Sequence, residues 1–156
     1  MRNGRRMALD IGKARIGIAV CDREGILASP LQAISRASNI SDTVNSILPA
    51  LTEYEVIELY VGEPVSLKGH ETESTHDART VALEIAAHTS VPVRLVDERL
   101  TTVSAALKLR AAGYNSRSSK DVIDSASAVE ILEIALAIEK NTGVAPGQLV
   151  GDSVGA

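Results

Sequence analysis

An aspartate interrupts one of the most apolar segments of the chain. Residues 7–11 are otherwise Met, Ala, Leu and Ile, and Asp10 stands among them. The segment has the pattern of a buried strand, where an ionised carboxylate is costly unless a cation or a hydrogen-bond donor meets it. We therefore expect Asp10 to have a partner, and a divalent metal ion is the natural candidate. Hydrogen bonds from the turn at residues 12–13 are the purely structural alternative.

Two further carboxylates stand where other elements begin or end. Glu98 follows the apolar run 93–96, and the ends of strands in open α/β sheets are where sites form. Asp124 lies at the start of the last predicted helix. Steps of three and four residues from Asp124 reach Ala128, Ile131, Ala135 and Ile138. Asp124 therefore shares the stripe of this helix that should face the sheet.

These three acids together suit one kind of chemistry. Magnesium and manganese prefer oxygen ligands, and two such ions about 4 Å apart can activate water and stabilise the leaving oxygen in phosphodiester hydrolysis. We therefore predict Asp10, Glu98 and Asp124 as metal ligands and catalytic residues. Spacing alone does not make the set specific. Glu98 could instead be a solvated residue paired with Arg99, and Asp124 could simply favour the helix N-terminus.

The elements that must position these acids follow from the hydrophobic pattern. Strands are predicted at 7–12, 16–21, 26–34, 56–61 and 91–96, and helices at 42–54, 74–88, 101–112 and 121–140. The polar residues 66–77 are predicted to form a mobile loop in their first half, and residues 113–120 are predicted to form a second loop. This order predicts one α/β domain over residues 1–140, with a mixed five-stranded sheet and helices on both faces. An antiparallel meander of three strands opens the sheet and parallel strands extend it. Residues 141–156 are rich in glycine and small residues, which predicts a disordered tail.

Composition limits the classes of function. With 156 residues and 45% hydrophobic residues, the chain can build a substantial core. No apolar run approaches the about 18 residues of a membrane span, so we expect no membrane association. The single cysteine, Cys21, excludes an internal disulfide and suits a reducing cytoplasm. The net charge of −4 and the absence of Phe and Trp argue against indiscriminate binding of nucleic acid and against base stacking on an aromatic platform.

Positive charge nevertheless gathers beside one of the proposed ligands. Basic residues bracket the loop 111–119, which leads directly into Asp124. Contacts of such residues with phosphate give affinity without sequence information, so we predict Arg117 and Lys120 as nucleic-acid contacts. The alternative is that these are ordinary surface charges.

Three segments resemble a known family. Residues 9–20, 97–102 and 122–132 are similar to the sequence blocks of the YqgF family, the RuvX-type Holliday junction resolvases, and the resemblance covers residues 6–140. It implies an RNase H-like fold and a metal-dependent nuclease that uses Mg²⁺ or Mn²⁺, with two ions. It also implies a substrate that is branched DNA or the precursor of 16S ribosomal RNA. By motif position, the acidic ligands would be Asp10, Glu98 and Asp124, and the phosphate contacts would include Lys13, Arg15 and Arg99.

The chain departs from the family pattern at one place. After the fourth strand the family has Gly, an apolar residue and Pro, whereas this chain has Glu63 in the middle position. Related RNase H-like resolvases carry a carboxylate at the end of this strand. Glu63 is therefore a candidate fourth metal ligand, and a solvated loop residue is the alternative.

Two other classes of function remain to be weighed. A non-catalytic nucleic-acid-binding or ribosome-assembly module could use the same fold, although it would be expected to lack the acidic ligands. The Asp-x-Gly turn also binds ATP phosphates in the superfamily of sugar kinases, actin and heat-shock chaperones, but those proteins need two related domains. If a symmetric four-way junction is the substrate, paired cuts call for a homodimer.

Overall fold

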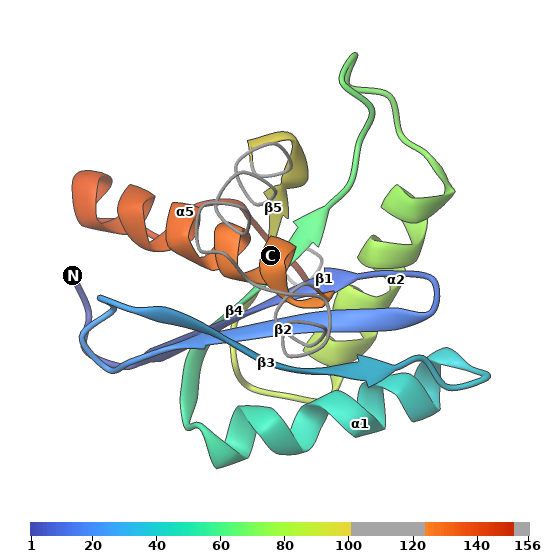
Figure 1. Cartoon of the computed structure of the whole chain (residues 1–156), viewed down its shortest axis with the longest axis horizontal. Helices are drawn as coiled ribbons and strands as arrows, with labels where there is room; N and C mark the ends of the chain where they lie inside the picture. The colour runs from blue at the N-terminus through green and yellow to red at the C-terminus, as the bar shows by residue number, and fades with distance from the viewer. Residues whose placement is uncertain (101–123, 152–156) are drawn as a thin grey trace, which may run out of the picture.

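The computed structural model describes residues 1–100 and 124–151 and contains a six-stranded mixed sheet (Figure 1). The strand order is β3-β2-β1-β4-β5-β6. The strands are β1 (Arg5–Ile11), β2 (Arg15–Cys21), β3 (Ala28–Ser35), β4 (Val56–Glu63), β5 (Val93–Asp97) and β6 (Gln148–Leu149). The helices are α1 (Ile40–Glu53), α2 (Glu73–Ala87) and α5 (Ala126–Thr142), with a 3₁₀ turn η1 (Glu98–Leu100) after β5.

The predicted strand arrangement is confirmed. β1, β2 and β3 form an antiparallel meander, and β4 and β5 extend it as parallel strands on the other side of β1. Most residues of β1 and β2 are buried on both faces, so the sheet is covered on both sides. The expected helix at 101–112 and loop at 113–120 lie outside the described residues. Within the described ranges, no helix combines the length and the apolar character that a membrane crossing requires.

The two faces of the sheet carry different side chains and different helices. Large aliphatic residues of β1, β2 and β4 pack against α1 and α2 on one face. Small residues, among them Ala8 and Ala19, lie on the other face, where α5 crosses the sheet (Figure 1). Because side chains alternate along a strand, Asp10 lies on the same face as Ala8, under α5. The segment between β4 and α2 projects away from the sheet, closed by a bridge between Val65 and Glu71.

A buried ion network, which the sequence analysis did not anticipate, joins the N-terminal end of the sheet to α5. Arg6 is fully buried and donates to Glu139 at 2.7 Å, and Arg2 binds both Glu139 at 2.6 Å and Glu58 at 2.8 Å. Arg94 of β5 completes the network with a 2.7 Å contact to Glu58. Burial opposes ionisation of Glu139, but hydrogen bonds from Arg2 and Arg6 hold its pKa at about 2. The C-terminal half of α5 is thereby fixed to β1 and β4.

The structure corrects the prediction for the C-terminal segment. α5 continues to Thr142, and β6 then pairs antiparallel with β5, which makes six strands where five were predicted. Val150 is buried, and its amide donates to the Val93 carbonyl at 2.8 Å. The prediction of a disordered tail is therefore wrong for residues 141–151, while 152–156 lie outside the described residues. The free edge of β5 supplies backbone partners for this segment, and composition alone does not reveal them.

The packing of this segment can be tested with two identical truncations. Val150→Ala removes two buried methyl groups and should lower the free energy of unfolding by about 1–2 kcal/mol. Val144→Ala makes the same change at a site that is 65% exposed and should alter stability far less. Denaturant unfolding of both variants measures the difference. Equal effects would show that residues 148–151 do not pack on the sheet in solution.

Candidate active site

Asp10 lies between two glycines on the face of the sheet under α5. Gly17 of β2 is its direct partner across the antiparallel pair. Gly62 of β4 follows Val61, the parallel partner of Leu9, and so stands beside Asp10 on its other side. With no side chain on either flank, the surface around Asp10 is open to groups that approach from other elements.

The carboxyl group of Glu98 occupies the space over one of these glycines. A Cβ atom on Gly62 would lie 2.4 Å from Glu98 Oε1 and 2.7 Å from Glu98 Cγ. From this position Glu98 forms a hydrogen bond with Asp10. Burial, which contributes most, the hydrogen bond to Asp10 and the negative charges of Asp10 and Asp97 together raise the pKa of Glu98 to about 9. Glu98 is therefore protonated at neutral pH when no cation is present.

The start of α5 packs on the other glycine. A Cβ atom on Gly17 would lie 2.4 Å from the Asp124 carbonyl oxygen and 3.1 Å from the Ser125 Cα atom. Asp124 is thus next to the direct strand partner of Asp10. Its carboxylate lies 3.5 Å from the Arg15 guanidinium, measured from Oδ2 to Nε.

The three predicted acids are brought to one region, but not into one cluster. Asp10 and Glu98 are in contact, whereas the described contact of the Asp124 side chain is with Arg15. Among residues 1–100 and 124–151, no three His, Cys, Asp or Glu side chains converge closely enough to hold a metal ion. The donor set nevertheless fits a hard cation, because two carboxyl groups in contact and a third beyond one glycine supply the oxygen ligands that such an ion prefers.

Glu63 is held on the opposite face. It follows Gly62 in β4, so its side chain points away from Asp10. Glu63 Oε2 accepts a 2.6 Å hydrogen bond from Arg79 Nε of α2, and Arg79 also lies 3.0 Å from Glu71. The structure thus places Glu63 neither beside the other acids nor in open solvent. The sequence could not show this, because Arg79 is sixteen residues further along the chain.

The predicted phosphate contacts that the structure describes lie on the surface near the acids. Lys13 is exposed in the turn between β1 and β2, and Arg15 is half-exposed where β2 begins. Arg99 is paired with Asp97 through hydrogen bonds of 2.9 and 3.0 Å from its Nε atom. Arg117 and Lys120 lie outside the described residues.

Arg36 supports the turn that carries Lys13, a role that sequence reasoning missed. Its guanidinium donates to the Gly12 carbonyl at 3.1 Å and to Asp77 of α2 at 2.8 Å. Arg36 therefore ties the end of β3 to the turn and to α2. A single arginine after a strand carries no signal of this role, since both partners are distant in sequence.

Comparison with known proteins now decides the family. The sequence model of RuvX, described as Holliday junction resolvase, matches residues 4–138. The chain belongs to the RuvX family. Membership in the RuvX family makes the protein a nuclease of the endonuclease class, as the sequence predicts.

Similar proteins and structures agree with RuvX membership. A protein of Clavibacter michiganensis subsp. michiganensis, named as a candidate pre-16S rRNA nuclease, is 49% identical over 96% of this chain and 93% of its own length. A protein of Streptomyces avermitilis with the same name is 46% identical, covering 95% of each chain. T. thermophilus RuvC in complex with Holliday junction substrate superposes with a TM-score of 0.62 at 14% identity, over 94% of this chain and 99% of that chain. This likeness confirms the RNase H-like fold.

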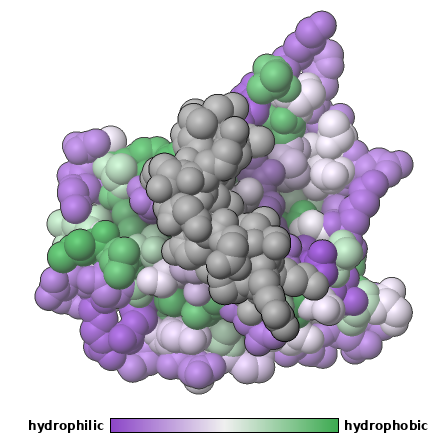
Figure 2. Space-filling view, in the orientation of Figure 1, coloured by the Kyte–Doolittle hydropathy of each residue, from purple (hydrophilic) through white to green (hydrophobic). Residues whose placement is uncertain are grey.

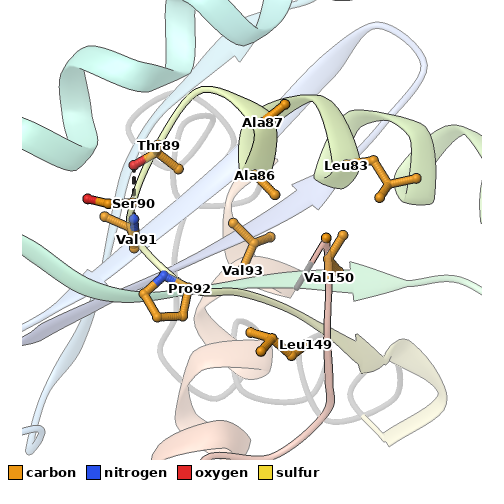
Figure 3. A pocket seen from close by; sticks show the side chains of 11 residues that line it. Leu83, Ala86, Ala87, Thr89, Ser90, Val91, Pro92, Val93, Leu149 and Val150 are labelled. Atoms are coloured by element: carbon orange, nitrogen blue, oxygen red, sulfur yellow. Dashed lines mark hydrogen bonds between the residues drawn. The ribbon is translucent and has the colours of Figure 1, made fainter. Parts of the chain in front are cut away.

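A cavity of about 600 Å³ lies elsewhere, between the C-terminal end of α2 and β6 (Figure 3). Leu83, Val93 and Val150 line it, and among residues 1–100 and 124–151 no ionisable side chain does. Val93 stands at the N-terminal end of β5, whereas Glu98 follows the C-terminal end. The cavity has no groups for phosphodiester chemistry, so the acids rather than the cavity mark the candidate active site.

The shared proton predicts a pH dependence of stability. Between the ordinary carboxyl pKa of 4.5 and about 9, the folded protein retains on Glu98 a proton that the unfolded chain has released. The contribution of Glu98 to the free energy of unfolding should therefore fall as pH rises through this window. Glu98→Gln mimics the protonated acid and should remove this slope. Denaturant unfolding with a chelator at a series of pH values tests this, and parallel curves for variant and wild type would contradict it.

The two glycines predict separable defects. The Cβ atom that Gly62→Ala introduces would contact the side chains of Glu98 and Ile131, which can move. The substitution should therefore leave a folded protein whose nuclease activity is reduced because Glu98 is displaced. Gly17→Ala meets the backbone of Asp124 and should destabilise the fold by about 1–3 kcal/mol, more than Gly62→Ala does. Thermal unfolding and cleavage assays on both variants separate the effects, and identical profiles would refute this account.

Proposed function

We propose that the protein is a metal-dependent endonuclease that cuts a structured nucleic acid, with Asp10, Glu98 and Asp124 as its metal-binding and catalytic residues. The observation that carries the proposal is the contact between Asp10 and Glu98 over Gly62. Two carboxyl groups in contact repel each other when both are ionised, and a divalent cation bound between them would remove that repulsion. Membership in a nuclease family supports the same chemistry.

Each acid has a defined part in this proposal. Mg²⁺ or Mn²⁺, with two ions, would supply Lewis-acid activation of water and charge stabilisation at the leaving oxygen. Asp10 and Glu98 would bind from the strand side, and Glu98 would release its proton on binding. Asp124 would bind from the segment just before α5 once its carboxylate leaves Arg15. Glu63 has no part, since Arg79 holds it on the other face of the sheet.

Basic side chains around the acids would hold the phosphate backbone. Arg15 and Arg99 each pair with an acid of this region, Asp124 and Asp97, at partly exposed positions where an incoming phosphate can compete. Lys13 adds an exposed charge, and Arg117 and Lys120 are proposed as further phosphate contacts. Figure 2 shows hydrophilic residues over much of the described part of this face, with apolar residues between them.

For the substrate, we favour the precursor of 16S ribosomal RNA over branched DNA. Relatives that are 46–49% identical across almost the whole chain are named for that RNA. The family description supports branched DNA as the second candidate. Only a four-way junction would call for a homodimer, so oligomeric state and substrate are linked in this proposal. The single buried cysteine suits activity in the cytoplasm.

Asp10→Asn tests the proposal directly. It should abolish cleavage of pre-16S rRNA in Mg²⁺ or Mn²⁺, because the amide is a poor ligand for a hard cation. Asp22→Asn is the matched control, since its Oδ1 atom accepts from the Ile26 and Leu27 amides and an asparagine oxygen can do the same. The control should cut at close to the wild-type rate.

Three results separate the alternatives. Cleavage of four-way DNA junctions but not of RNA by the same preparation would reassign the substrate. A wild-type protein that binds RNA yet cuts neither substrate would favour a non-catalytic assembly module. Full activity in Asp10→Asn would remove Asp10 from the mechanism.

A further inference from the structure

Ser125 uses its hydroxyl in an unusual way. It is the residue before α5, where a serine ordinarily accepts a hydrogen bond from the first turn of the helix. Here the side chain makes no such capping bond. Instead, Ser125 Oγ accepts from the Ile18 amide at 3.0 Å and donates to the Leu31 carbonyl at 2.8 Å. The residue is fully buried between α5 and the sheet.

The two backbone partners stand at an irregularity in the sheet. β2 and β3 pair at Ile16 with Ile34 and next at Ile18 with Leu31, so two steps on β2 match three on β3. β3 therefore has an extra residue, which makes a bulge opposite Gly17. Ser125 Oγ bridges the amide and the carbonyl of the first pair beyond the bulge. The hydroxyl thus joins the start of α5 to one particular point in the sheet.

This point is adjacent to the proposed ligands. Asp124 immediately precedes Ser125, and its carbonyl group packs on Gly17, the direct partner of Asp10. Gly17 limits how closely α5 can approach, whereas the two hydrogen bonds of Ser125 fix where α5 begins along β2. Gly17 and the hydrogen bonds of Ser125 together determine the position of the Asp124 backbone relative to Asp10.

We propose that Ser125 is a positioning residue, which holds the start of α5 on the β2–β3 bulge and so places the Asp124 carboxylate for metal binding. The proposal rests on the function proposed above, in which Asp124 is a metal ligand. Metal sites tolerate displacements of only about 0.2 Å in ligand distance, so a loose first turn would weaken the site without unfolding the protein.

Ser125→Ala tests the proposal, with Ser127→Ala as the matched control. Ser127 lies two residues further along the same turn and is only half-buried. Calorimetric titration of the metal-free protein with Mn²⁺ gives the affinity directly. We expect Ser125→Ala to weaken Mn²⁺ binding roughly tenfold or more, the usual range for residues that orient ligands. The Mn²⁺ concentration for half-maximal cleavage should rise by the same factor, while kcat at saturating Mn²⁺ changes only a few-fold.

Hydrogen exchange supplies the structural readout. The Ile18 amide should exchange faster in Ser125→Ala and should be unchanged in Ser127→Ala. If Ser125→Ala does not fold, Ser125→Cys keeps the size of the side chain with a weaker hydrogen-bonding group. The cysteine variant should then show a smaller loss of Mn²⁺ affinity in the same direction.

The outcomes separate this inference from the proposed function. In one contrary result, Ser125→Ala loses the hydrogen-exchange protection of the Ile18 amide yet binds Mn²⁺ with wild-type affinity. That result would show that Ser125 only stabilises the fold, and it would overturn the proposal for Ser125. A wild-type protein that binds Mn²⁺ but cuts no substrate would overturn the proposed function and leave the positioning role supported by the binding data. A wild-type protein that binds no Mn²⁺ would overturn both.

Discussion

The close approach of α5 to the sheet is the constraint on which the candidate active site depends. The residues on this face are small: Ala8, Ala19, Gly17 and Gly62. The helix and the Glu98 carboxyl group can therefore pack directly on the backbone of the strands. Asp10 is the one acid of β1 on this face. A larger residue at either glycine would occupy the space that Asp124 or Glu98 now fills.

The two ends of α5 are held by different kinds of interaction. The C-terminal half is fixed by the buried ion network of Arg6 and Glu139, where losing one partner of such a pair costs about 3–5 kcal/mol. The N-terminal end is fixed by two neutral hydrogen bonds from Ser125, each worth about 1 kcal/mol. The strong anchor is thus remote from the acids, and the weak one adjoins them. The helix is therefore held on the sheet mainly by its C-terminal half, while the position of its first turn depends on the two hydrogen bonds of Ser125.

The sequence showed those features that depend on local pattern. Asp10 stands out because it interrupts an apolar run, and Glu98 because it follows one. The meander and parallel strands followed from the order of the elements. The remaining features depend on partners that are distant along the chain. Ser125 meets residues 94 and 107 positions away, and Arg6 meets one 133 positions away. β6 forms because β5 has a free edge, and Glu63 turns from a candidate ligand into an ion-pair partner because α2 presents Arg79.

The position of α5 along the chain has a consequence for synthesis on the ribosome. β1 to β5 precede α5 in sequence, so the α1 and α2 side of the core can assemble while the other face of the sheet is still bare. Asp10 of β1 and Glu98 of η1 are synthesised before α5, which is complete only when residue 142 has been added. A nascent chain shorter than this lacks the anchored Asp124 and so carries an incomplete site. The candidate active site is therefore assembled late in synthesis, after the segments that carry Asp10 and Glu98 are already available.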